Sequence, residues 1–211
     1  MKFNNNQTSS SKYKMSFGVG GLFYQEGITA TEQYVRIKDW SNVRDKIIKE
    51  NLFQTRTGSS LVRISREIIS RLKTLSFEQL EIINQGSRQD QIQMLWIAAC
   101  KRYVFIYEFA VEVIREKFLL MDYVLTEDDY TIFFDTKAEW HEEIENLKDS
   151  TKKKLKQVLF KILREAEITS DANIILPSIL SKEMAKILLN DKSGVYRVLP
   201  VSDIDLKEWA K

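Results

Sequence analysis

Residues 50–75 read ENLFQTRTGSSLVRISREIISRLKTL, and this stretch predicts a helix with one apolar and one basic face. Apolar residues recur in it at the 3.6-residue period of an α-helix. The stripe consists of Leu61, Ile64, Ile68, Leu72 and Leu75. The Gly-Ser-Ser run in front of the stripe is typical of a helix start. We therefore expect a helix over about residues 59–75 whose apolar stripe packs into a core.

The opposite face of this predicted helix is basic. The cations on it or just before it are Arg56, Arg63, Arg66 and Lys73. The surrounding range 36–73 holds ten Lys/Arg and four Asp/Glu, a net charge of +6. Such a surface favours phosphate as a partner, and we interpret these four residues as candidate DNA contacts. The alternative is an ordinary solvated helix face.

Composition favours a chain built mainly from helices. It has 211 residues, 44% of them hydrophobic, with only seven Gly and two Pro to interrupt long elements. This length suits one domain or two small ones. The single cysteine, Cys100, excludes an internal disulfide and any metal site built from several cysteines.

The overall net charge of +2 hides a strong segregation of charge. Range 122–149 holds ten acids and two lysines, and range 152–164 then holds six cations and no acid. The second range lies in a predicted helix that Asp149 and Ser150 would cap and that extends to about residue 166. Its candidate DNA contacts are Lys152, Lys153, Lys156, Lys161 and Arg164. Lysines in a first helical turn oppose the helix dipole, which indicates a function, or else pairing with the acidic range upstream.

The chain divides into three predicted parts. Residues 1–12 are predicted to be a disordered Asn/Ser-rich tail, 13–121 an N-terminal helical bundle, and 122–211 a C-terminal helical subdomain. The other expected helices lie near 22–36, 40–50, 76–86, 87–121 (with a break near 102–104), 127–137, 139–147, 181–190 and 203–210. Ser76 with Gln79 has the spacing of a capping box. Apolar runs at 173–177 and 195–200, each ended by a proline, predict a short β-hairpin or winged-helix-like ending.

Residue patterns for catalysis are scarce. His141 is the only histidine, which excludes HExxH zinc sites, and neither a GxSxG nor a Walker A motif is present. The glycines of SFGVGG lack the third position of a dinucleotide-binding motif. Asp135 and Lys137 have the acid–x–lysine spacing of some nucleases, but in helical sequence. We expect no enzyme activity, no catalytic or metal-binding residues and no cofactor.

The longest apolar run is far shorter than the roughly 20 residues that cross a bilayer, so we expect a soluble cytoplasmic protein without membrane contact.

Three long segments resemble the BrxA family of bacterial BREX (bacteriophage exclusion) defence systems. They are ENLFQTRTGSSLVRISREIISRLKTLS, LWIAACKRYVFIYEFAVEVIREKFL and FFDTKAEWHEEIENLKDSTKKKLKQVLFKILREA. The opening SFGVGGLFYQEG is also similar, so the resemblance spans roughly residues 16–190. It implies a mostly helical, non-enzymatic protein that binds double-stranded DNA, works with other BREX proteins in phage restriction, and partly resembles the NusB fold.

The expected fold is therefore an all-α bundle, in part NusB-like, with a short C-terminal β-hairpin. The expected function is that of a double-stranded-DNA-binding accessory protein of a BREX system. The resemblance does not identify DNA-contacting residues, so the nine candidates rest on charge and periodicity alone. Two alternatives remain open, a protein–protein adaptor within the defence complex and an RNA-binding protein like NusB.

Overall fold

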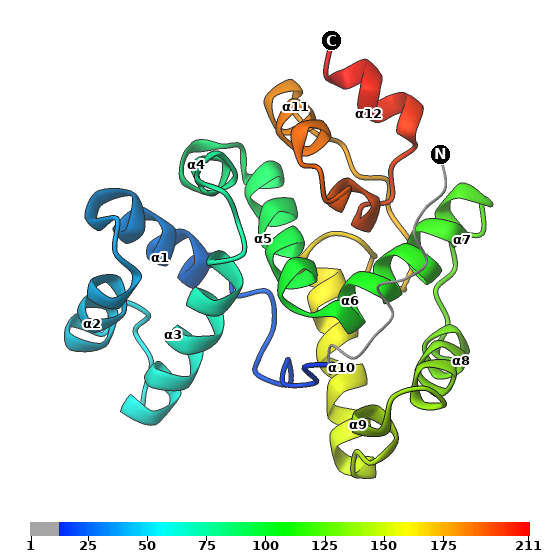
Figure 1. The fold of residues 1–211 in the computed structure, drawn as a ribbon, viewed down its shortest axis with the longest axis horizontal. Helices are drawn as coiled ribbons and strands as arrows, with labels where there is room; N and C mark the ends of the chain where they lie inside the picture. Colours follow the sequence, from blue (N-terminus) through cyan, green and yellow to red (C-terminus); the bar gives the residue numbers. More distant parts are fainter. Residues whose placement is uncertain (1–12) are drawn as a thin grey trace.

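The computed structural model describes residues 13–211 as an assembly of helices (Figure 1). Within this range no β-strand forms, and only two isolated β-bridges occur. The predicted all-α class is confirmed for the described part of the chain. The tail predicted for residues 1–12 lies outside it.

Five helices form the N-terminal half. They are α1 (Tyr24–Ile37), α2 (Trp40–Glu50), α3 (Gly58–Leu72), α4 (Phe77–Gln85) and α5 (Arg88–Arg102). Helix α1 packs against the other four, and α3 also packs against α2 and α5. All five match the predicted ranges to within a few residues, because each carries an apolar stripe and α2 to α5 also begin at a capping side chain.

Side-chain caps set several of these helix starts. Thr57 accepts a hydrogen bond from the backbone N–H of Ser60 at the start of α3. At the start of α4, Ser76 and Gln79 exchange both hydrogen bonds of a capping box, as their spacing predicts. Each cap satisfies N–H groups that have no partner inside the helix.

The centre of the molecule is one long helical passage with a break. Helix α5 ends before Tyr103, whose backbone is extended, and the chain continues through α6 (Val104–Phe109), a π-helical turn η1 (Ala110–Arg115) and α7 (Glu116–Leu119). The predicted break near 102–104 is confirmed. Large side chains from this passage are fully buried, among them Trp96, Phe105 and Phe109.

The acidic and basic ranges form α8 (Glu127–Ala138), α9 (Glu142–Glu145) and α10 (Asp149–Glu165). The first residue of α10 is preceded by Lys148, which takes the cap position without a side-chain hydrogen bond. The prediction that Asp149 and Ser150 cap this helix is therefore wrong. Asp149 instead places its carboxylate in the first turn, where it faces the positive end of the helix dipole.

The predicted β-hairpin does not form. Helix α11 (Lys182–Asn190) is followed by a 3₁₀ turn, η2 (Val195–Val198), and by α12 (Asp203–Trp209). Residues 173–176 pair instead with two other segments, through the bridges Val124–Ile174 and Thr169–Ile175.

Around residues 198–201, side chains donate the hydrogen bonds that a second strand of a hairpin would have donated to the backbone carbonyls. The Trp96 indole donates to the Val198 carbonyl at 2.9 Å, and the buried Arg115 guanidinium donates to the Val201 carbonyl at 2.7 Å. Val195 and Val198 are buried through this turn. The compact turn therefore buries its apolar side chains and gives these carbonyls hydrogen-bond donors without a second strand.

One continuous hydrophobic cluster joins residues from both halves of the chain, from Tyr13 to Leu206. The division at residue 121 stays a prediction.

Candidate nucleic-acid interface

Helix α3 presents its predicted basic face to solvent. Leu61, Ile68 and Leu72 are buried, whereas Arg63 and Arg66 are exposed on the other side. Arg56 and Lys73, just outside the two ends of the helix, are also exposed. Within residues 13–211 none of these four cations forms an ion pair. Their full charge is therefore available to a ligand.

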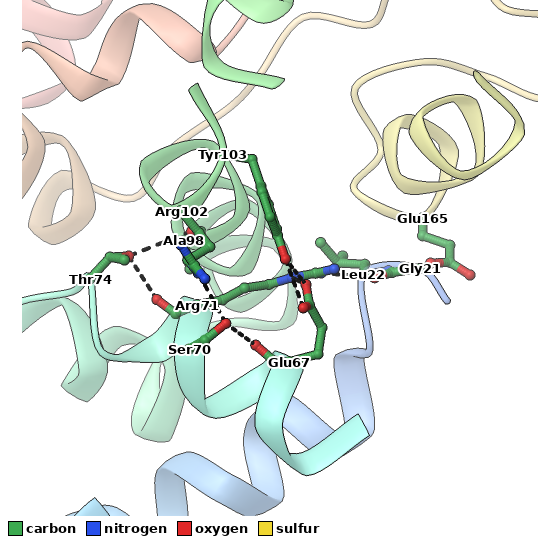
Figure 2. Close-up of polar contacts among 10 residues, drawn as sticks. All are labelled: Gly21, Leu22, Glu67, Ser70, Arg71, Thr74, Ala98, Arg102, Tyr103 and Glu165. Atoms are coloured by element: carbon green, nitrogen blue, oxygen red, sulfur yellow. Dashed lines mark hydrogen bonds and ion pairs between the residues drawn. The ribbon is translucent and has the colours of Figure 1, made fainter. Parts of the chain in front are cut away.

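A buried polar network holds α3 on its inner side, opposite the basic face (Figure 2). The Arg71 guanidinium donates to the Glu67 carboxylate at 2.7 Å. The Tyr103 hydroxyl lies 2.7 Å from each oxygen of the same carboxylate and donates to it. Burial, and then the neighbouring Glu67 charge, raises the pKa of Tyr103 to about 12. These contacts hold α3 against the break between α5 and α6.

The buried pair changes how the charge of range 36–73 is distributed. Arg71 and Glu67 are one of its ten cations and one of its four acids, and they neutralise each other inside the protein. Nine cations and three acids remain at exposed or half-buried positions. The net charge of +6 therefore belongs to the surface.

A glycine-containing loop connects α3 to α10. The Gly21 carbonyl accepts a hydrogen bond from Arg71 at 2.8 Å, and the Leu22 N–H donates to the Glu165 carboxylate at 2.6 Å (Figure 2). A Cβ on Gly21 would lie 2.2 Å from a Glu165 oxygen, and Gly20 has a φ of +85° that favours glycine. The SFGVGG motif thus serves close packing. Sequence reasoning missed this role, although two adjacent glycines signal a close backbone approach.

The candidate cations of α10 are less free than those of α3. Lys156 pairs with Glu127 at 2.8 Å, and Lys161 lies 3.6 Å from Glu165. The Lys152 ammonium lies 5.6 Å from the centre of the Phe134 ring. Lys153 is exposed. The acidic segment upstream therefore neutralises part of this basic helix.

Arg164, the last of the candidates, lies between two open clefts. Its guanidinium is 3.4 Å from the Asn173 side-chain oxygen. One cleft, between α8 and α10, has a volume of about 490 Å³; the other, between α10 and the start of α1, has about 540 Å³. Figure 1 shows α3 and α10 on either side of the segment that leads into α1.

Part of the acidic range has a structural role. The Lys117 ammonium lies 2.6 Å from the Asp122 carboxylate and 3.3 Å from that of Asp129. Asp129 also completes a capping box with Thr126 at the start of α8. Burial alone would raise the pKa of Asp129, but hydrogen bonds from Thr126 and Lys117 lower it overall. These acids stabilise the α7–α8 turn.

The lysine of the nuclease-like spacing is engaged in other contacts. Lys137 contacts Glu108 at 2.7 Å and Glu112 at 2.8 Å, and it lies on a helix rather than on a strand. In the described part of the chain, no group of three or more His, Cys, Asp and Glu side chains could hold a metal ion. Cys100 is buried, and burial raises the pKa of its thiol. Among residues 13–211, no helix combines the length and apolar character that a membrane span requires.

Comparison with known proteins gives one family and one fold. A sequence profile of the BrxA family matches residues 11–192. A Bacillus cereus protein named BREX protein BrxA is 35% identical over 124 residues, which span 59% of this chain and 62% of that protein, less than two thirds of its length. A BREX protein BrxA from Paramagnetospirillum magneticum is 26% identical over 194 residues, 90% of this chain and 98% of that one. The crystal structure of an uncharacterized protein from Magnetospirillum magneticum superposes with a TM-score of 0.76 at 24% identity, covering 90% of this chain and 99% of that chain, which shows a shared fold.

Proposed function

This chain belongs to the BrxA family, and we propose that it is a non-enzymatic, double-stranded-DNA-binding component of a BREX phage-defence system. The observation that carries this proposal is the outer face of α3. Arg63 and Arg66 are exposed there without ion pairs, on a helix that a buried network holds in place. Unpaired cations on a rigid helix suit the evenly spaced phosphates of a duplex.

The proposed contacts are to phosphates and not to base edges. Arg56, Arg63, Arg66 and Lys73 supply the first set of contacts. On α10, Lys152, Lys153, Lys156, Lys161 and Arg164 supply a second, partly neutralised set. Phosphate contacts position a protein on DNA without reading its sequence, so we expect low sequence specificity.

A second candidate function is docking onto other BREX proteins. The turn after α7 exposes large apolar side chains, with Leu120 76% and Met121 78% exposed. Apolar side chains this exposed are typical of protein contact sites when they cluster. Docking through this turn is compatible with DNA binding through α3, because the two surfaces use different elements.

Charge reversal tests the DNA proposal. We expect Arg63→Glu with Arg66→Glu to weaken binding to a fluorescent DNA duplex by about tenfold or more, because phosphate contacts are replaced by repulsion. The matched control is Lys182→Glu with Lys186→Glu, the same charge change at two exposed positions of α11. Circular dichroism checks that both variants are folded.

The same assay separates the nucleic-acid alternatives. Duplex DNA, duplex RNA and single strands are compared at one salt concentration, and we expect duplex DNA to bind most tightly. Equal loss of affinity in the α3 and α11 variants would contradict the assignment of the α3 face. A clear preference for RNA would instead support the NusB-like alternative.

A further inference from the structure

The cleft between α8 and α10 combines several cationic and amide side chains with a single carboxylate. Its lining residues are Glu127, Lys153, Lys156, Gln157, Phe160, Arg164 and Asn173. Five of them come from α10, where Lys153, Lys156 or Gln157, Phe160 and Arg164 follow at three- to four-residue spacing and so share one side of the helix. Four charged residues in a small cleft, three of them cations, give it a net positive lining.

We propose that this cleft is a second phosphate-binding site, in which the Glu127 carboxylate occupies the phosphate position until a phosphate displaces it. This inference rests on the proposed function, since it adds a regulated subsite to the DNA-binding surface. The ligand chemistry is a phosphate group, either from a nucleic-acid backbone or from a free polyphosphate.

The donors in the cleft suit a phosphate. The Lys156 ammonium already binds a carboxylate oxygen there, at 2.8 Å from Glu127. Lys153 and Arg164 form no ion pair with any residue of range 13–211, although both line the same space. Ammonium and guanidinium groups together with side-chain amides bind the several oxygens of a phosphate through charge-assisted hydrogen bonds.

Glu127 has the properties of a displaceable competitor. It lies in the first turn of α8, where the capping box of Thr126 and Asp129 fixes the backbone. Its side chain is nevertheless 79% exposed and free to move away. The hydrogen bond from Lys156 lowers the pKa of Glu127, which favours the charged carboxylate in this pair. Exposed ion pairs of this kind are weak, and a phosphate carries at least as much charge.

The floor of the cleft disfavours recognition of a base. Phe160 is only 7% exposed, and its ring packs edge-on against Tyr130 at a centroid distance of 6.2 Å. Neither ring offers an open face for stacking. The chemistry of the site is therefore that of phosphate binding, without a means of reading a nucleobase.

Glu127→Gln is the decisive variant, because it removes the competing charge and keeps the side-chain shape. Asp128→Asn is its matched control, since Asp128 is the exposed neighbour in the same helical turn and does not line the cleft. Each variant is titrated with inorganic tripolyphosphate by calorimetry and with a DNA duplex by fluorescence anisotropy. These two probes distinguish a free polyphosphate from a backbone phosphate.

We expect Glu127→Gln to bind tripolyphosphate about twofold to fivefold more tightly than Asp128→Asn, the factor that corresponds to one exposed ion pair. Lys153→Gln with Lys156→Gln should abolish this binding, whereas Arg63→Glu with Arg66→Glu should leave it unchanged. If the natural ligand is a nucleic-acid backbone, Glu127→Gln should also tighten duplex binding.

The outcomes separate this inference from the proposed function. If Glu127→Gln binds neither probe more tightly than Asp128→Asn, the cleft is not a regulated phosphate site, even when the α3 variant loses duplex binding. If the parent protein fails to bind a duplex but the tripolyphosphate pattern holds, the proposed function is wrong and the cleft remains a site for free polyphosphate.

Discussion

The backbone N–H of Leu22 donates a hydrogen bond to the carboxylate of Glu165, with 2.6 Å between nitrogen and oxygen. The preceding carbonyl, that of Gly21, accepts from Arg71 on α3. A two-residue piece of loop therefore contacts both basic helices through backbone groups. The relative orientation of these helices depends on a segment that carries no candidate DNA contact.

Replacement of Glu165 by Leu tests this connection. We expect the free energy of unfolding to fall by about 1 to 2 kcal/mol, because the Leu22 N–H loses a charged acceptor. Glu165→Gln keeps an acceptor oxygen and serves as the control. Urea denaturation of the two variants measures the difference, and equal stability would show that the hydrogen bond is dispensable.

Replacement of Glu67 by Ala tests the network behind α3. This change leaves the Arg71 guanidinium and the Tyr103 hydroxyl buried without their carboxylate partner. Loss of one member of a buried pair costs about 3 to 5 kcal/mol, so the variant should unfold at much lower urea concentration. Arg66→Ala, one position earlier and exposed, should change stability by less than about 0.5 kcal/mol. Similar urea midpoints for the two variants would contradict the described burial.

The raised pKa of Tyr103 predicts that the folded protein loses stability at alkaline pH. This pKa is raised from 10.0 to about 12 in the folded protein, because burial and Glu67 disfavour the phenolate. The contribution of this shift to the free energy of unfolding is full below pH 10. It is lost as the pH rises from about 10 to about 12, because Tyr103 then ionises in the unfolded chain but stays protonated in the folded protein. The size of the contribution is of order 2 kcal/mol.

The alkaline prediction is checked by urea denaturation as a function of pH. Tyr103→Phe should reduce the slope of stability against pH in this window. Burial also raises the pKa values of Tyr13 and Tyr130, so part of the slope should remain in the variant. An unchanged slope would mean that Tyr103 ionises as easily in the folded protein as in the unfolded chain.

Salt should weaken duplex binding in proportion to the phosphates contacted. The logarithm of the affinity should fall with the logarithm of salt concentration at about −0.9 per phosphate. The slope for Arg63→Glu with Arg66→Glu should be shallower, because fewer counterions are released. Fluorescence anisotropy over a salt series gives both slopes. Affinity that does not change with salt would exclude an electrostatic interface.

Local patterns in the sequence were sufficient for the helices. The stripe from Leu61 to Leu72 and the capping pair Ser76–Gln79 predict α3 and the start of α4, because periodicity and capping act within one or two helical turns. The exposed positions of Arg63 and Arg66 follow from the same stripe. The division of the α3 surface into apolar and basic faces was therefore determined by sequence alone.

Contacts between distant segments were decided only by the tertiary structure. Residues 195–198 look like a strand in sequence, yet they form a 3₁₀ turn because Trp96 and Arg115 supply partners for nearby carbonyls. The pairing of Lys156 with Glu127 depends likewise on how α8 and α10 pack together. A strand or an ion pair needs a partner from another part of the chain, and spacing along one sequence does not specify which segment supplies it.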